Sequence, residues 1–167
     1  NISNNLLRGG PSFKMPGSTE GSLNISTDNS KKVRVYAGNY HGFGDLQSFK
    51  IHEYWAGIFI RPTNALSVWL EPDFTKSNRV MQYVSSEESS AGARYIFAEL
   101  DQKTTFFTFT LNYTFSPELS LEYYGQPFVS AGKYSHFKRV TNSQANRFSD
   151  RYHSFSASEL SYDDAES

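Results

Sequence analysis

The chain has no cysteine, almost no net charge and no long apolar run. Its 167 residues include 16 basic and 17 acidic side chains, which gives a formal net charge of −1. The absence of cysteine excludes disulfide scaffolds, thiolate zinc sites and cysteine nucleophiles. The charge balance excludes a nucleic-acid binder that relies on overall positive charge, so we expect no nucleic-acid partner. No stretch approaches the ~18 consecutive apolar residues of a membrane helix.

Aromatic residues are abundant, and they alternate with polar ones. The chain contains 14 Phe, 11 Tyr and 2 Trp, which is 16% of its residues, and this content argues against a disordered segment. In residues 104–115 most odd positions are aromatic or aliphatic, and most even positions are Thr or Asn. Residues 32–37, 66–71 and 119–124 alternate in the same way. A period of two is typical of strands, and no segment shows a helical stripe, so we expect an all-β chain.

Two kinds of connection separate these alternating runs. Tight polar turns are predicted at residues 27–31, 61–64 and 116–118. Looser connections are predicted at residues 42–45, at 85–90 and from about residue 138 onward. Short turns on one side of a sheet and longer loops on the other are typical of transmembrane β-barrels.

Placing the tight turns at one end of the sheet requires about six long, meandering strands, several of them longer than the ~9–11 residues that cross a bilayer. We predict these strands at residues 6–27, 32–40, 47–60, 65–84, 93–115 and 119–137. The apolar parity shifts between Ile96–Leu100 and Phe107–Phe109. We interpret this shift as a β-bulge near Asp101–Lys103, and a tight hairpin at the same place is the competing interpretation.

One apolar and one polar face fit two architectures. In an antiparallel transmembrane β-barrel the aromatic face contacts lipid and the polar face lines the lumen. In a soluble extracellular β-sandwich, such as a carbohydrate-binding module, the aromatic face is the interior. The predicted strand length favours the barrel segment, because a small sandwich has no need of strands of ~20 residues. The sandwich is kept as the alternative.

Five segments together resemble a known family. They are residues 7–13, 94–104, 111–121, 126–132 and 134–138, which read LRGGPSF, RYIFAELDQKT, LNYTFSPELSL, QPFVSAG and YSHFK. In this order they resemble a family of large Gram-negative outer-membrane proteins of unknown function. Those proteins pair an N-terminal sugar-binding-like β-sandwich, similar to a carbohydrate-binding module, with a C-terminal β-barrel. The resemblance covers about residues 6–148 and lies in the barrel, which implies a location in the bacterial outer membrane.

The resemblance also implies that the barrel is larger than this chain. Family members run to several hundred residues, and about six strands are fewer than the ~8 needed to close a bacterial barrel. An open sheet in lipid leaves edge N–H and C=O groups unpaired. The chain begins Asn1-Ile2 without methionine, so we expect a mature form or a portion of a longer barrel, or a barrel completed by another outer-membrane chain. The expected layout is a barrel segment over residues 1–137 and an extracellular loop or irregular tail over residues 138–167.

No residue pattern predicts catalysis, a metal or a cofactor. The four histidines lack metal-ligand spacing: His41, His52, His136 and His153. The acidic pairs Glu87-Glu88 and Asp163-Asp164 lie on polar segments and are interpreted as solvated loop charges. A glycosidase needs two carboxylates held ~5–10 Å apart in a cleft, and no such pair is evident. We therefore expect no enzyme, and an outer-membrane glycan hydrolase is a rival hypothesis.

The candidate functional residues are the polar side chains expected to face the lumen. They are Arg8, Lys14, Arg34, Glu71, Asp73, Glu99, Glu122 and Tyr124. Such groups line a permeation path or pair with one another across a plugged interior. Aromatic residues near the loops are candidates for stacking on sugars, although membrane-interface girdles use the same residue types: Tyr40, Phe43, Tyr83, Tyr134 and Phe137.

The expected function is a membrane-spanning scaffold or pore. Its full-length form is expected to bind or pass glycans, or to serve in an outer-membrane complex. The expected partners are outer-membrane lipid and either further strands of the same barrel or another outer-membrane chain, with a glycan as a candidate ligand.

Overall fold

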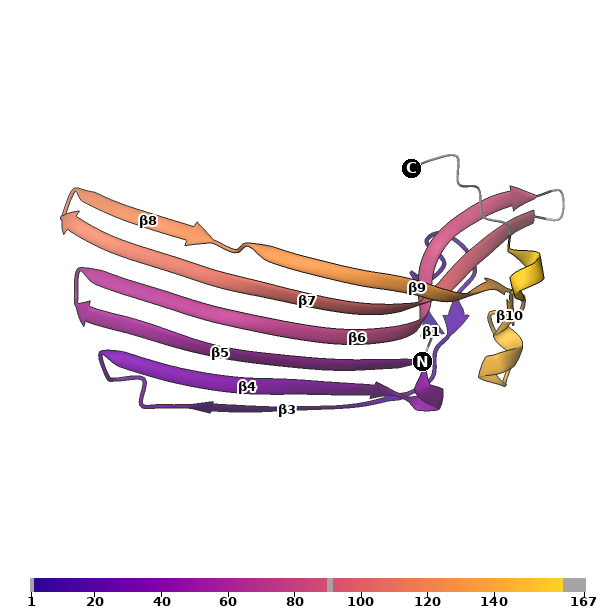
Figure 1. Cartoon of the computed structure of the whole chain (residues 1–167), viewed down its shortest axis with the longest axis horizontal. Helices are drawn as coiled ribbons and strands as arrows, with labels where there is room; N and C mark the ends of the chain where they lie inside the picture. Colours follow the sequence, from indigo (N-terminus) through magenta and orange to yellow (C-terminus); the bar gives the residue numbers. More distant parts are fainter. Residues whose placement is uncertain (1, 90–91, 161–167) are drawn as a thin grey trace.

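The chain folds into one long antiparallel sheet, shown in Figure 1 as a computed structural model that describes residues 2–89 and 92–160. The strands of this sheet are β3 (Ser18–Ser26), β4 (Val33–Gly44), β5 (Phe49–Thr63), β6 (Leu66–Ser89), β7 (Gly92–Ser116), β8 (Leu119–Gly125), β9 (Phe128–Val140) and β10 (Tyr152–Ser154). Their order is β10-β9-β7-β6-β5-β4-β3, and β8 also pairs with β7. Consecutive strands are therefore neighbours, which is a meander.

The sheet curls into half of a barrel. Figure 1 shows the strands side by side along the long axis, with β6 and β7 bending upward at one end. Strands β8 and β9 lie nearly in line and together follow β7 from Ile96 to Ser116. Within residues 2–89 and 92–160, β3 at one edge does not pair with β8, β9 or β10 at the other. The curl is thus left open.

The two ends of the sheet differ, and they are named here by their connections. The turn end holds the short connections β3–β4, β5–β6 and β7–β8, and the loop end holds the β4–β5 connection and the chain after β9. At the loop end, η1 (Asp45–Gln47) joins β4 to β5. The segments before β3 and after β9 also pack at the loop end, where Lys14 N–H donates to Ser143 O at 3.0 Å.

The small core lies at the loop end rather than along the sheet. It is formed by side chains from both terminal segments and from the β6–β7 hairpin: Leu7, Phe13, Met81, Phe97 and Phe148. The N-terminal segment carries the short pair β1 (Ile2–Ser3) and β2 (Phe13–Lys14), and the C-terminal segment carries η2 (Phe148–Arg151) and η3 (Ala157–Glu159). The buried Arg151 guanidinium donates to Lys14 O, Ala145 O and Asn146 O, which ties the two segments together.

The predicted all-β antiparallel sheet of long meandering strands is confirmed, with corrections to its elements. The strand predicted at residues 6–27 is reduced to β3, because the preceding residues fold back over the loop end. The loose connection predicted at residues 85–90 is strand up to Ser89. The strand predicted at residues 119–137 is divided into β8 and β9 at Gln126-Pro127, since proline has no N–H to donate to the ladder.

The β-bulge predicted near Asp101–Lys103 is wrong, and so is the competing hairpin. There β7 runs unbroken through Gly92–Ser116, and Leu100, Asp101, Gln102 and Lys103 pair in unshifted register with β6. The parity shift has another cause. Phe107 and Phe109 share their face with Lys103 and Asp101, so that face changes from apolar to polar along the strand, while Ile96, Ala98 and Leu100 lie on the other face.

Candidate functional site

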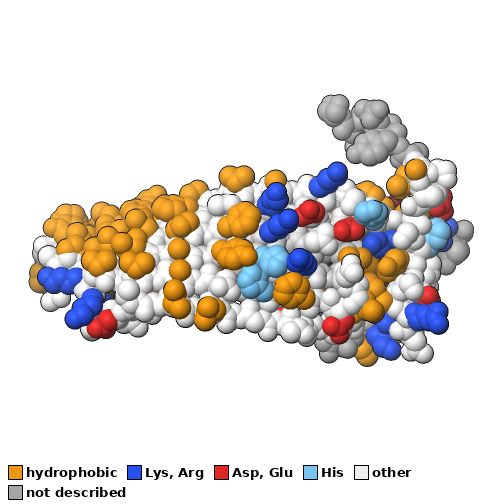
Figure 2. Space-filling view, turned by 60° about the horizontal axis from the view of Figure 1, so that its bottom comes forward, with side chains coloured by type: hydrophobic (Ala, Val, Ile, Leu, Met, Phe, Trp, Pro, Cys, Tyr) orange, Lys and Arg blue, Asp and Glu red, His pale blue; other side chains and the backbone are white. Residues whose placement is uncertain are grey.

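Apolar side chains cover the half of one sheet face that lies toward the turn end. We call this face the outer face, and we call its apolar half the apolar belt. The belt comprises Leu23, Ile25, Val33, Val35, Ala37, Tyr54, Ala56, Ile58, Ile60, Leu66, Val68, Leu70, Pro72, Phe74, Phe107, Phe109, Leu111, Tyr113, Leu121, Tyr123 and Val129. In Figure 2 the belt is the broad apolar surface at the left.

The belt is exposed although it is apolar. Ile25 is 65% exposed, Val35 is 48% exposed and Tyr123 is 53% exposed. Within the described residues the other sheet is the two-stranded β1–β2 pair, which packs at the loop end. A contiguous apolar surface of this extent marks an interaction with lipid or with another protein surface.

A band of basic side chains follows the belt on the same face. Tyr54 and Phe74 form the last belt row, and in the next row His41 pairs with His52, His52 with Lys76, and Lys76 with Lys103. One row further, Lys50 pairs with Asn78 and Asp101 pairs with Lys133. The basic band is defined as His41, His52, Lys50, Lys76, Lys103 and Lys133. Figure 2 shows blue and pale-blue side chains beside the apolar surface, toward the loop end.

The opposite face is polar, and it is the inner face of the curl. Tyr36 on β4 accepts a hydrogen bond from Trp69 Nε1 and donates one to the Glu71 carboxylate, both on β6. Strand β5 lies between β4 and β6, so these side chains reach across two strand spacings of ~4.8 Å each. Side chains converge in this way on the concave side of a curved sheet.

Two glycines make this reach possible. Gly57 on β5 pairs with Tyr36, and a Cβ at Gly57 would overlap the Tyr36 ring. Gly38 pairs with Trp55 in the same manner, and its missing side chain leaves room for the indole. Each glycine therefore lets an aromatic ring lie flat over the backbone of the inner face.

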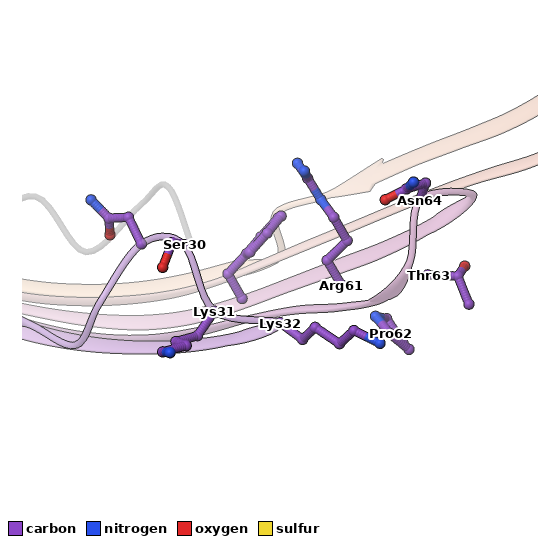
Figure 3. A pocket seen from close by; sticks show the side chains of 9 residues that line it. Ser30, Lys31, Lys32, Arg61, Pro62, Thr63 and Asn64 are labelled. Carbon is purple, nitrogen blue, oxygen red and sulfur yellow. The ribbon is translucent and has the colours of Figure 1, made fainter.

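Three cationic side chains are among those that line a pocket of about 480 Å³ at the turn end. Figure 3 shows Lys31, Lys32 and Arg61 around it, with side chains of the two neighbouring turns. The Arg61 guanidinium lies 5.5 Å from the centre of the Phe59 ring, and Arg34 donates to Asn29 Oδ1 at 3.2 Å. The turn end therefore carries its own group of cations.

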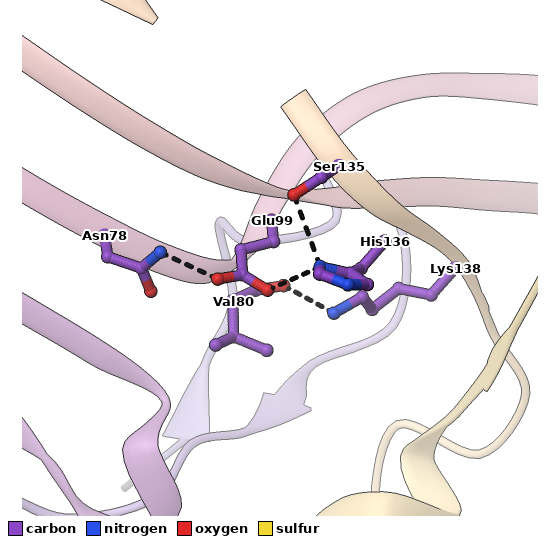
Figure 4. Close-up of polar contacts among 6 residues, drawn as sticks. All are labelled: Asn78, Val80, Glu99, Ser135, His136 and Lys138. Carbon is purple, nitrogen blue, oxygen red and sulfur yellow. Dashed lines mark hydrogen bonds and ion pairs between the residues drawn. The ribbon is translucent and has the colours of Figure 1, made fainter. Parts of the chain in front are cut away.

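A polar cluster lies beyond the apolar belt at the loop end (Figure 4). Glu99 accepts a hydrogen bond from Asn78 Nδ2 at 2.7 Å and lies 3.0 Å from His136 Nδ1. These contacts, led by the Asn78 bond, lower the pKa of Glu99 below its usual value, although partial burial opposes them. Lys138 is buried and donates to Val80 O at 3.0 Å. Burial lowers the Lys138 pKa, while the Glu99 charge acts in the opposite direction.

The predicted lumen-facing residues fall into three groups. Arg34, Glu71, Asp73, Glu122 and Tyr124 lie on the inner face, where Arg34, Trp69, Thr110 and Tyr124 share one register row through Phe59. Glu99 lies on the face of Asp101 and Lys103, which is the outer one. Arg8 and Lys14 lie outside the large sheet, where the Arg8 guanidinium covers the Tyr83 ring at 4.7 Å and Lys14 Nζ donates to Asn146 at 3.4 Å.

Sequence reasoning missed the pairing of His41 with His52, whose Nδ1 atoms are 2.6 Å apart. It also missed the basic band, since Lys50, Lys76, Lys103 and Lys133 come from four strands and meet only through the register. In residues 2–89 and 92–160, no three or more His, Asp or Glu side chains form a group that could hold a metal ion. No helix in that part of the chain is long and apolar enough to cross a membrane. The predicted acidic pair Asp163-Asp164 lies outside the described residues.

The fold and its two faces define a class: an all-β meander curled into a half-barrel, with a polar inner face and an apolar outer belt. The chain belongs to the family described as the domain of unknown function DUF5916, whose model matches residues 7–162. No curated protein and no solved structure matches the chain.

Proposed function

We propose that this chain forms part of the membrane-spanning wall of a larger outer-membrane β-barrel. The observation that carries the proposal is the exposed apolar belt. On β6 the belt runs from Leu66 to Phe74, about nine residues, which agrees with the ~9–11 that a tilted strand needs to cross a bilayer. Aromatic rings lie at both limits of the belt, Tyr54 and Phe74 toward the loop end and Tyr113 and Tyr123 toward the turn end. Girdles of this kind are typical of outer-membrane barrels.

The charged side chains at the two limits of the apolar belt also support a membrane-spanning role. Lys31, Lys32 and Arg61 lie at the turn end, and the basic band lies on the loop side. Cations at both limits of an apolar surface match the two charged surfaces of a bilayer. Short turns then face the periplasm and the long β6–β7 hairpin faces outward.

The open edges support a role within a larger assembly. A membrane-spanning sheet edge leaves N–H and C=O groups unpaired, which costs several kcal/mol for each group in lipid. Strands β3 and β8 are not paired with each other in the described chain, so the proposal requires further strands of the same protein or of a partner chain. The immediate role of this segment is architectural: it separates a polar lumen from lipid. Binding or passage of glycans would be a property of the complete barrel.

The soluble β-sandwich is the competing proposal. It requires a second sheet over the apolar belt, and the described residues offer the β1–β2 pair, which packs against the loop-end core instead. A sandwich therefore needs a separate sheet from elsewhere to cover side chains such as Val129, which is 75% exposed.

Labelling in intact cells tests the proposal. The full-length protein is produced in a Gram-negative host with a single introduced cysteine, either Glu87→Cys on the β6–β7 hairpin or Asn64→Cys at the turn end. A membrane-impermeant maleimide is expected to label the first variant in intact cells and the second only after permeabilisation. Recovery of the folded protein in the soluble fraction, without detergent, would contradict a membrane-spanning role.

A further inference from the structure

The basic band is the strongest feature that a membrane-spanning role leaves unexplained. Its lysines Lys50, Lys76, Lys103 and Lys133 are all exposed, and none of them forms an ion pair within the described residues. If this part of the wall only had to be hydrated where it leaves the apolar belt, neutral polar side chains would be sufficient. The band instead concentrates positive charge on four adjacent strands.

The register makes this arrangement unfavourable for the isolated chain. Lys76 lies directly opposite Lys103, and His52 lies directly opposite Lys76. Like charges in directly opposed positions destabilise a sheet. Among the described residues, Asp101 is the acidic side chain that shares the face and rows of the band, and it lies directly opposite Lys133, one row from Lys76 and Lys103. The Glu99 carboxylate already accepts a hydrogen bond from Asn78 and contacts His136. Within the described residues, Asp101 is thus left to offset four lysines, and the band keeps a net positive charge.

The position of the band indicates which counter-charge it takes. It begins in the row after Tyr54 and Phe74, where the apolar belt ends. It shares the belt's outer face, so on a membrane-spanning wall it lies at headgroup depth and points toward lipid. The charge in that layer is carried by phosphate groups, and exposed Lys side chains near a membrane surface are attracted to anionic lipid.

We propose that the basic band binds the phosphate groups of anionic lipid headgroups on the loop side of the membrane. The inference rests on the proposed membrane-spanning role and adds a lipid class to it. Lys76 and Lys103 form the centre of the site, Lys50 and Lys133 flank it in the next row, and the His41–His52 pair extends it by one strand. The aromatic row beneath, Tyr54 and Phe74, contacts the upper acyl chain.

Lipid-association measurements test the site. The full-length protein is reconstituted into phosphatidylcholine vesicles that contain spin-labelled phosphatidic acid or spin-labelled phosphatidylcholine. Electron paramagnetic resonance separates the lipid held at the protein surface from bulk lipid. We expect a several-fold preference for phosphatidic acid, and a smaller preference at high salt, because salt screens exposed charges.

Matched variants locate the preference. The double variant Lys76→Gln, Lys103→Gln is expected to lose most of the preference for phosphatidic acid. The double variant Lys76→Arg, Lys103→Arg is expected to keep the preference. Lys14→Gln with Arg34→Gln changes the net charge equally but lies off the outer face, and it should leave the preference unchanged. Retention of the heat-modifiable electrophoretic mobility of a folded barrel shows that each variant is folded.

The outcomes separate the two claims. If lipid associates with the protein but shows no preference for phosphatidic acid, the lipid site is overturned and the membrane-spanning role stands. The same conclusion follows if the two glutamine substitutions leave the preference intact. The absence of held lipid of either kind rejects the membrane-spanning role, and the lipid site with it.

Discussion

Tyr36 connects strands β4 and β6 across the intervening strand β5. Its hydroxyl receives the Trp69 indole N–H and donates to Glu71, and Gly57 leaves space for its ring. A partly buried donor or acceptor that loses its partner costs roughly 1–3 kcal/mol. The hydroxyl therefore contributes to the curvature of the inner face as well as to its polarity.

This contact gives a prediction at the residue scale. Tyr36→Phe is expected to lower the free energy of unfolding by roughly 1–3 kcal/mol, because both Trp69 and Glu71 lose a partner. Tyr113→Phe is the matched control, since Tyr113 lies on the outer face and its hydroxyl has no hydrogen-bond partner in the described chain. Urea titration of the refolded barrel measures both. Equal effects of the two substitutions would refute the assigned contact.

Glu159 provides a second residue-scale prediction, at the end of the described chain. The backbone N–H and the hydroxyl of Ser156, together with His153, lower the Glu159 pKa from 4.5 to about 2. Because the Glu159 pKa is lower in the folded turn than in the unfolded chain, the ionised carboxylate stabilises the turn when the pH is above about 4.5. This stabilisation is lost as the pH falls from about 4.5 toward 2. A spin label at Ala157→Cys should therefore become mobile over that pH range. With Glu159→Gln the label should be mobile at every pH, and a transition that persists in that variant would contradict the assignment.

Individual residues were predictable where the strand alternation alone decides their face. Arg34, Glu71 and Asp73 follow the alternation of β4 and β6 and lie together on the inner face. The sequence predicts the lumen side for Glu99 as well, but that prediction assumed a bulge that β7 does not contain. Arg8 has a left-handed backbone with φ of 43°, and a positive φ at a non-glycine residue has no clear sequence signal.

At the scale of elements, β7 (Gly92–Ser116) explains why the sequence pattern was misleading. Its outer positions are aromatic at Phe107 and Phe109 but charged at Lys103 and Asp101. A strand whose outer face crosses from one environment into another changes its polarity pattern without a bulge of its own, and the register shifts near residues 97–100 come from extra residues in the neighbouring strands β6 and β9. Analysis of sequence periodicity interprets such a change as a bulge. The alternation of side chains along a strand does not show where the strand passes from an apolar into a polar environment.

The outer face of β7 carries the element-scale prediction. Phe109→Lys is expected to cost roughly 2–4 kcal/mol, because it places a charge in the middle of the apolar belt. Asn112→Lys lies on the inner face, opposite Glu122, and is expected to change the free energy of unfolding little. Both are measured by denaturant titration in lipid vesicles. A cost at Asn112 equal to that at Phe109 would remove the distinction between the faces.

The turn end and the strands that lead to it were predictable, whereas the loop end and the division of the last predicted strand into β8 and β9 were not. Alternation and polar turns predict β4 to β7 to within a few residues, because each turn directly precedes a new alternating run. The loop end depends on contacts between residues far apart in the sequence, such as Arg151 with Lys14 and Gln144 with Ser12. Local patterns carry no information on such contacts.

At the scale of the whole molecule, the half-barrel has an exposed apolar belt, a polar inner face and two edges that do not meet within residues 2–89 and 92–160. In water the exposed apolar belt is unfavourable, and in lipid the unpaired edges are. Together they are consistent with a wall that has lipid on one side, an aqueous lumen on the other and further strands at its edges. The central claim is that the outer face contacts lipid.

The most direct test places spin labels on the two faces of one strand. Each label is attached to the single cysteine of a full-length variant that carries Phe109→Cys, Asn112→Cys or Lys103→Cys and no other cysteine; these 167 residues contribute none of their own. In lipid vesicles that contain the full-length protein, we predict that oxygen reaches the label at residue 109 most readily and that a water-soluble nickel chelate reaches the labels at residues 103 and 112. High chelate accessibility at residue 109, equal to that at residue 112, would contradict the account.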